Sequence, residues 1–145
     1  MRGLIQRVSY ARVIVDGQVV GEIGRGLLLL LGMQKGDTPQ KIDKLLNKVI
    51  AYRVFPDAVG RMNLGLAEVQ GGLLIVSQFT LAADTQKGLR PAFSAALPPG
   101  DAEILYDEFV TRAQARCGVV GTGIFGADMK VQLENDGPVT FMLES

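Results

Sequence analysis

The run of leucines between Gly26 and Gly32 constrains the fold of this chain more than any other segment. Residues 27–31 are all leucine, so both alternating faces of an extended strand would be apolar. The run is too short for a typical helix, and a glycine bounds it at each end. The sequence therefore predicts a strand that is buried on both faces.

Two other segments have the pattern of amphipathic helices. The first follows Asp37 or Thr38 as N-cap, with Pro39 early in its first turn. Its buried stripe is Ile42, Leu45, Leu46, Val49 and Ile50. The second begins at residues 98–101 and ends with Arg116, before Gly118. Its apolar face is Ala102, Leu105, Phe109 and Ala113.

Alternating apolar and polar residues predict strands at both ends of the chain. Residues 4–23 contain Asp16-Gly17 between two β-branched runs, which is a strong hairpin signal. Residues 53–66 have the composition of strand ends and turns, and residues 129–133 and 139–143 suggest a second hairpin around residues 135–138. We expect one α+β domain over residues 1–145, with a mostly antiparallel, barrel-like β core and two packed helices.

The segment Gly72 to Leu81 is predicted to be a central strand whose character changes at Ser77. Before that residue both faces are apolar, whereas Ser77, Gln78 and Thr80 are polar. This change has two interpretations. It can mark a strand that leaves the core at a functional site, or a strand end whose hydroxyl groups satisfy local backbone groups.

The absence of histidine restricts the chemistry most. It excludes Ser-His and Cys-His catalysis and histidine metal ligands, and leaves carboxylates, hydroxyls, lysine, backbone amides or the substrate itself to move protons. The single cysteine, Cys117, excludes an internal disulfide and favours a reducing compartment. No segment approaches the length of a membrane span or resembles a signal peptide, so we expect a cytoplasmic protein with no membrane association. A formal net charge of zero argues against coating long duplexes, although a nucleic-acid end could still bind.

Two short motifs carry a resemblance to a known family. Ser77-Gln78-Phe79-Thr80-Leu81 and Asn135-Asp136-Gly137-Pro138-Val139-Thr140, in this order in a short chain without histidine, resemble the D-aminoacyl-tRNA deacylases. The resemblance runs from the start at Arg7-Val8 through residues 90–93 to the terminal segment.

That resemblance implies hydrolysis of the ester between a D-amino acid, or mischarged glycine, and the terminal ribose of tRNA, without a cofactor or metal. It also implies a homodimer, in which Gln78, Phe79 and Thr80 of one chain line a pocket that Gly137-Pro138 of the partner closes. The Gly-Pro bond would be cis. The sequence alone, without the resemblance, favours an ordinary turn at residues 136–138.

The available residues suit such a reaction, because an aminoacyl ester is already activated. Backbone N–H groups near Phe79 and Thr80 are candidates to stabilise the oxyanion. The vicinal ribose hydroxyl of the substrate could transfer the proton. Alternatively the Thr80 hydroxyl could act as a nucleophile, but the sequence shows no base beside it.

Further candidates are less specific. Phe125, with Met129 nearby, could bind the terminal adenine by stacking, or Phe125 could anchor a loop. Ser77 belongs to the expected substrate-binding segment, where it could instead support the backbone. Arg7, Lys87 and Arg90 could contact tRNA phosphates or be solvated surface charges. Besides the hydrolase, two functions stay open: a noncatalytic dimeric module that binds tRNA ends or amino acids, and a general esterase.

Overall fold

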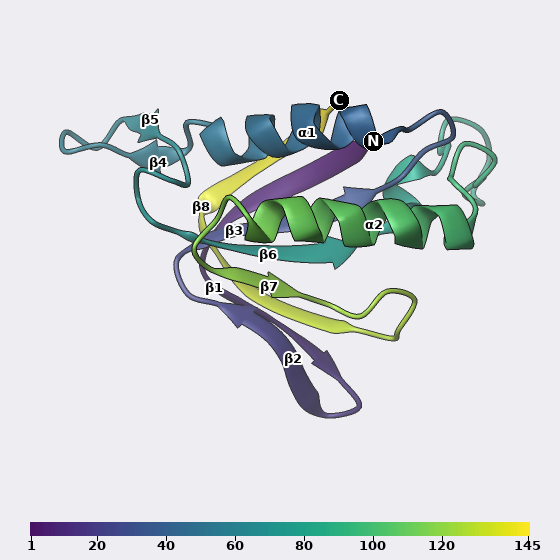
Figure 1. Cartoon of the computed structure of the whole chain (residues 1–145), viewed down its shortest axis with the longest axis horizontal. Helices are drawn as coiled ribbons and strands as arrows, with labels where there is room; N and C mark the ends of the chain where they lie inside the picture. Colours follow the sequence, from purple (N-terminus) through teal and green to yellow (C-terminus); the bar gives the residue numbers. More distant parts are fainter.

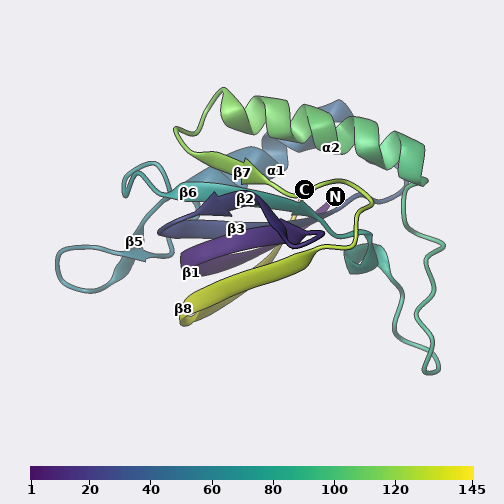
Figure 2. The same cartoon turned by 90° about the horizontal axis from the view of Figure 1, so that it is seen from below.

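A computed structural model describes all 145 residues of the chain. Two helices lie side by side over one face of a strongly curved sheet (Figure 1). The six strands of the sheet are β1 (Arg2–Val15), β2 (Gln18–Ile23), β3 (Gly26–Gly32), β6 (Gly72–Ser77), β7 (Val120–Thr122) and β8 (Lys130–Glu144). The helices are α1 (Pro39–Ala51) and α2 (Pro99–Gln114), and the view from below shows both on the same side of the sheet (Figure 2).

The long strand β1 organises the sheet. Along one edge its first half pairs with β3 and its second half with β2, and β8 pairs along the other edge, all antiparallel. β6 is parallel to both β3 and β7. Near Thr122 of β7, β2 comes so close that a Cβ on Gly21 would lie 2.1 Å from the Thr122 carbonyl oxygen. The sheet thus curls into a nearly closed barrel, in agreement with the expected α+β, barrel-like class.

The leucine strand is buried on both faces, as its sequence predicts. Leu27 and Leu29 belong to the larger apolar cluster beneath the helices, whereas Leu28 belongs to a second cluster inside the curled half of the sheet. β6 divides its side chains in the same way, with Leu73 and Ile75 toward the helices. β3 and β6 are therefore central strands covered from both sides.

Both predicted helices are confirmed, with small differences at their ends. The four residues of α1 that are fully buried are Ile42, Leu45, Leu46 and Val49. Thr38 occupies the N-cap position without a side-chain cap, and the Asp37 carboxylate accepts hydrogen bonds from the Gln34 amide and the Met1 amino group instead. α2 ends at Gln114, two residues before Arg116.

The N-terminal hairpin is also confirmed. Asp16 and Gly17 both have positive φ, at 49° and 75°, as a two-residue turn between twisted antiparallel strands requires. Residues 53–66 hold a small separate hairpin, β4 (Phe55–Pro56) with β5 (Met62–Leu64), which projects beyond the main sheet (Figure 1).

The predicted C-terminal hairpin is wrong. Residues 130–144 form the single strand β8, because the fourteen-residue β1 offers a partner along the whole length. The N-terminal half of β8 pairs with Val8–Ile14, and its C-terminal half pairs with Arg2–Gln6. Residues 136–139 therefore bulge out opposite Arg7. An interrupted strand and a hairpin show the same alternation of apolar and polar residues. Only the pairing with a distant strand, here β1, distinguishes them.

Candidate active site

A pocket of about 710 Å³ opens where the parallel strands β3 and β6 end. The N-terminal turn of α2 and the segment that leads into β8 form its other walls. Five of the predicted site residues line it, namely Ser77, Gln78, Phe79, Phe125 and Met129. Ligands of α/β folds commonly bind beyond the carboxyl ends of parallel strands.

The polar end of the segment 72–81 is not strand, which corrects the prediction. β6 ends at Ser77, and residues Phe79–Ala82 form the short 3₁₀ helix η1. The ladder with β3 ends with the 2.8 Å hydrogen bond from the Gln78 amide to the Leu31 carbonyl. Because β3 itself ends at Gly32, the chain has no partner beyond this point and turns.

Gly32 allows the turn to lie directly on β3. A Cβ at this position would be 2.9 Å from the Gln78 carbonyl oxygen and 3.0 Å from the Leu81 Cβ. The glycine at the end of the leucine run thus allows the backbone of residues 78–81 to approach the backbone of β3 closely. Because Gly32 has no side chain, η1 can pack against the end of β3 at the rim of the pocket.

The first two amides of η1 have no acceptor within η1 itself. The Leu81 amide donates to the Gln78 carbonyl and the Ala83 amide to the Thr80 carbonyl, whereas Phe79 N–H and Thr80 N–H stand at the start of the helix, before its first internal hydrogen bond. A helix start leaves such donors without an intrahelical partner. Both residues are exposed on the surface.

Thr80 itself does not line the pocket. The Gln78 side-chain amide donates a short hydrogen bond to its hydroxyl. No lysine, aspartate or glutamate contacts that hydroxyl within hydrogen-bond distance. The local geometry therefore supplies no general base for a threonine nucleophile.

Aromatic side chains form two walls of the pocket. Phe79 packs against Phe93 with ring centroids 5.1 Å apart, and Phe125 packs against Tyr106 at 5.8 Å. Phe93 and Tyr106 were not among the predicted site residues. The spacing of Tyr106 from Ala102 and Phe109 on α2 places it on the buried face, which is the signal that could have found it.

The Tyr106 hydroxyl donates a 2.8 Å hydrogen bond to the Ile75 carbonyl of β6. Burial, with a smaller effect of the nearby Asp107 charge, raises its pKa to about 12. Tyr106 is therefore a neutral structural donor that ties α2 to the central strand. It is not available as a base near neutral pH.

Gly137 and Pro138 do not reach this pocket. They lie exposed in the bulge of β8, and the peptide bond between them is cis, as the resemblance implies. Asn135 closes the bulge, because its side-chain oxygen accepts the Val139 amide at 2.7 Å. Arg7 holds the other side, with Nε 2.8 Å from the Asp136 carbonyl oxygen and Nη1 2.6 Å from the Val54 carbonyl oxygen.

The three predicted tRNA contacts lie in different surroundings. Lys87 and Arg90 are exposed on the segment between η1 and α2, which projects from the body of the molecule (Figure 2). Arg7 is mostly buried and donates to groups of its own chain. The structure gives Arg7 a positioning role, and the phosphate contact of all three residues stays a prediction.

Two further findings concern membrane-spanning helices and metal-binding groups. No helix is both long enough and apolar enough to cross a membrane. No group of three or more His, Cys, Asp or Glu side chains is arranged to hold a metal ion. The charged residues that line the pocket are Lys35 and Asp128.

Comparison with known proteins specifies the class of protein to which this fold and pocket belong. The family model described as D-Tyr-tRNA(Tyr) deacylase matches residues 4–144. The D-aminoacyl-tRNA deacylase of Cellvibrio japonicus (strain Ueda107) is 65% identical over 99% of both chains. A solved structure named c-Myc DNA Unwinding Element Binding Protein has a TM-score of 0.95 and 38% identity, covering 100% of this chain and 99% of that one.

A second solved structure shows the same fold at lower identity. It is described as a structural analysis of a probable eukaryotic D-amino acid tRNA deacylase, with a TM-score of 0.86 and 18% identity, covering 99% of this chain and 98% of that chain. The chain belongs to the D-Tyr-tRNA(Tyr) deacylase family. It is accordingly a hydrolase that acts on ester bonds, and membership supports D-aminoacyl-tRNA as its substrate.

Proposed function

We propose that this hydrolase removes D-amino acids and glycine from tRNA by stabilising an oxyanion on the backbone of η1. The observation that carries the proposal is the start of η1 at the rim of an apolar pocket, where Phe79 N–H and Thr80 N–H have no acceptor within the helix. The pocket is large enough for a nucleoside. Phe125 and Met129 line the pocket, and in the proposed complex they contact the terminal adenine.

In the proposed reaction the ester carbonyl lies against the two amides. Water attacks the carbonyl carbon, and the developing negative charge on the carbonyl oxygen is stabilised by the Phe79 and Thr80 N–H groups. The vicinal ribose hydroxyl accepts the water proton and passes its own proton to the departing ribose oxygen. The ester C–O bond then breaks, which releases the free amino acid and tRNA.

This route needs no covalent intermediate. Thr80 has no basic partner, and its hydroxyl is engaged by Gln78. Holding an activated ester beside water and two donors lowers the barrier by orientation as well as by charge stabilisation. We therefore assign Gln78 and Thr80 to the positioning of η1 and the substrate.

Selection between enantiomers needs a second copy of the chain. Gly137 and Pro138 are exposed and lie outside the pocket of their own chain, and in this proposal they act on the pocket of a neighbouring copy. In a homodimer their backbone would bind the substrate amino group and exclude an L side chain, while glycine has no side chain to exclude. Specificity would then arise by rejection.

The test compares release of tyrosine from D-tyrosyl-tRNA and L-tyrosyl-tRNA, with substoichiometric protein and a chelator present. Rapid release from the D ester alone, together with release from glycyl-tRNA, is the expected result. Equal rates for both enantiomers would contradict selection by rejection. Turnover of a small acyl ester without a vicinal hydroxyl would favour the general esterase, and absence of turnover would favour the binding module.

Two related proposals follow from the substrate. We expect the protein in the cytoplasm, where charged tRNA is used, with Lys87 and Arg90 near the acceptor end. The name of one similar structure refers to DNA unwinding elements. The formal net charge of zero argues against binding of long DNA by this chain.

A further inference from the structure

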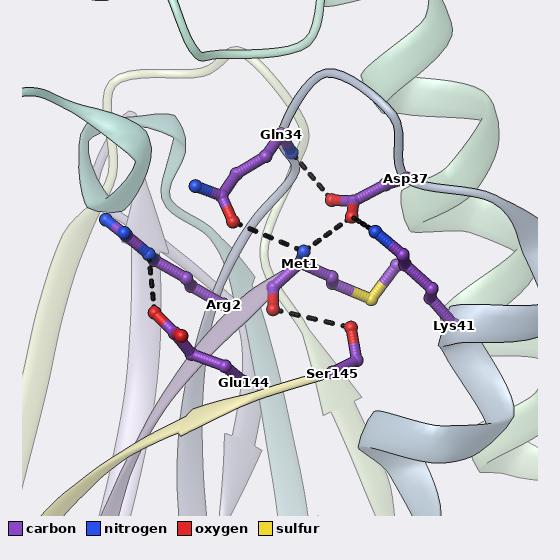
Figure 3. A network of polar contacts seen from close by, with 7 residues as sticks. All are labelled: Met1, Arg2, Gln34, Asp37, Lys41, Glu144 and Ser145. Carbon is purple, nitrogen blue, oxygen red and sulfur yellow. Dashed lines mark hydrogen bonds and ion pairs between the residues drawn. The ribbon is translucent and has the colours of Figure 1, made fainter.

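Arg2 connects the two ends of the chain to η1. Its backbone pairs with Gly32 in β3 and with Glu144 in β8, so the residue sits in the middle of the sheet. Its guanidinium Nε donates to the Glu144 carboxylate at 2.8 Å, as Figure 3 shows. Its Nη1 donates to the Leu81 carbonyl oxygen, within η1, at 2.9 Å.

We infer that Arg2 is a positioning residue for the reaction, because its guanidinium holds η1 in the orientation that presents the Phe79 and Thr80 amides to the substrate. The inference rests on the proposed role of those amides. Arg2 does not line the pocket, so it acts through η1 and touches no substrate.

η1 has few other restraints. The Gln78 amide fixes its start on β3, and the absent side chain of Gly32 allows it to lie there. Beyond that start, Arg2 is the only side chain from outside the segment that donates a hydrogen bond to η1. Among the side chains of η1 only Ala82 is buried, and Phe79 is 58% exposed although its ring packs against Phe93.

The residue that carries this guanidinium is itself firmly placed. The Met1 amino group lies 2.6 Å from Asp37 Oδ1, and neither side chain is more than 1% exposed. The other Asp37 oxygen accepts the Gln34 amide at 2.7 Å (Figure 3). Met33 and Lys35, on either side of Gln34, line the pocket. Met1 and Arg2 therefore support two parts of the site: the segment around Gln34 through Asp37, and η1 through Leu81.

The experiment replaces Arg2 by methionine, which keeps the aliphatic stem and removes all donors. Arg53→Met is the matched control, because Arg53 also donates to a main-chain oxygen, that of Asn63, but in the remote β4–β5 hairpin. We expect Arg2→Met to lower kcat on D-tyrosyl-tRNA by about 10-fold to 100-fold, since small displacements of catalytic groups have effects of this size. KM should change by less than about threefold, because the adenine pocket is intact.

Two further measurements separate positioning from loss of fold. Arg2→Lys retains a charged group that donates hydrogen bonds, so we expect it to recover part of kcat by donating to the Leu81 carbonyl. Hydrogen exchange of the peptide that spans residues 78–83 should be faster in Arg2→Met than in Arg53→Met, with exchange in α1 and β3 unchanged.

The outcomes are distinguishable. Unchanged kcat with faster exchange at residues 78–83 would overturn the inference, because η1 would then be held by Arg2 without consequence for turnover. Unchanged exchange would overturn it as well. Failure of the wild-type chain to release D-tyrosine would instead contradict the proposed function, whereas the exchange result would still report on the contact.

Discussion

The Arg7 guanidinium lies opposite the point where β8 leaves its ladder with β1, 2.8 Å from the Asp136 carbonyl oxygen. Through Nη1 it also binds the Val54 carbonyl, so one side chain links the bulge of β8 to the segment after α1. The bulge carries Gly137 and Pro138 on the surface. Arg7 thus fixes the part of the chain that we propose to act on a neighbouring pocket.

Replacing Arg7 by methionine should destabilise the protein by about 2 kcal/mol, because a hydrogen-bonded charge is lost and the Val54 carbonyl is left unpaired. The side chain is only 13% exposed, so solvent compensates poorly. Urea unfolding measures the change. Arg61→Met is the control, since the Arg61 side chain makes no hydrogen bond and should shift the free energy of unfolding by less than about 0.5 kcal/mol. Equal effects of the two substitutions would contradict the role of Arg7.

Replacing Thr80 by alanine should leave kcat on D-tyrosyl-tRNA within about tenfold of wild type, because the hydroxyl positions Gln78 and forms no bond to the substrate. Single-turnover kinetics and a search for an acyl-enzyme by mass spectrometry provide the measurement. A loss of roughly 10⁴-fold or more, as removal of a nucleophile produces, would establish covalent catalysis instead.

Replacing Gly137 by alanine should distort the bulge, because a Cβ there would lie 2.6 Å from the Val139 amide nitrogen. That amide is the one that Asn135 binds. We expect deacylation of D-tyrosyl-tRNA to fall by at least about tenfold, through misplacement of the segment that faces the substrate.

Gly118→Ala is the control for that substitution, since no atom lies within 4 Å of the position of its Cβ. The ratio of D to L turnover is recorded for both variants. An active, fully selective Gly137→Ala protein would show that the bulge has no part in selection.

The buried Tyr106 hydroxyl should make stability fall in strong alkali. Its pKa is raised from the ordinary 10.0 to about 12, so the unfolded chain releases this proton at lower pH than the folded chain. The contribution is complete below pH 10.0 and is lost as the pH rises through about 12.

The free energy of unfolding in urea, measured at pH values of about 9 and about 11.5, tests this dependence. Tyr106→Phe should lose stability at the lower pH, because the Ile75 carbonyl loses its partner, and should show a weaker decrease between the two values. An identical decrease in both proteins would assign the pH dependence to other groups.

Much of the fold was predictable because the relevant information is local. The alternation and turn residues of 4–23 specify a hairpin, the stripe from Ile42 to Ile50 specifies a helix, and the leucines of 27–31 specify a buried strand. Each pattern reports which faces of one element are apolar. The first family motif likewise indicated Ser77–Phe79, and the loop at residues 123–129 indicated Phe125 and Met129; the structure brings them together in one pocket.

The errors occurred where the partner strand decides the outcome. The segment 72–81 turns at Gln78 because β3 has ended, and residues 130–144 stay in one strand because β1 is long enough to pair with both halves. Neither partner's length can be known from the alternation of the segment itself.

The sequence by itself thus determined the elements, their buried faces and the residues from which the chemistry must be drawn in a chain without histidine. Only the tertiary structure decided that Phe79 and Thr80 begin a short helix beside the pocket, that Arg2 reaches Leu81 across 79 positions of sequence, and that Gly137 and Pro138 stand apart from their own chain's pocket. The physical reason is that hydrogen-bond satisfaction and proximity depend on which strands meet, and such pairings leave no periodic trace in any single segment.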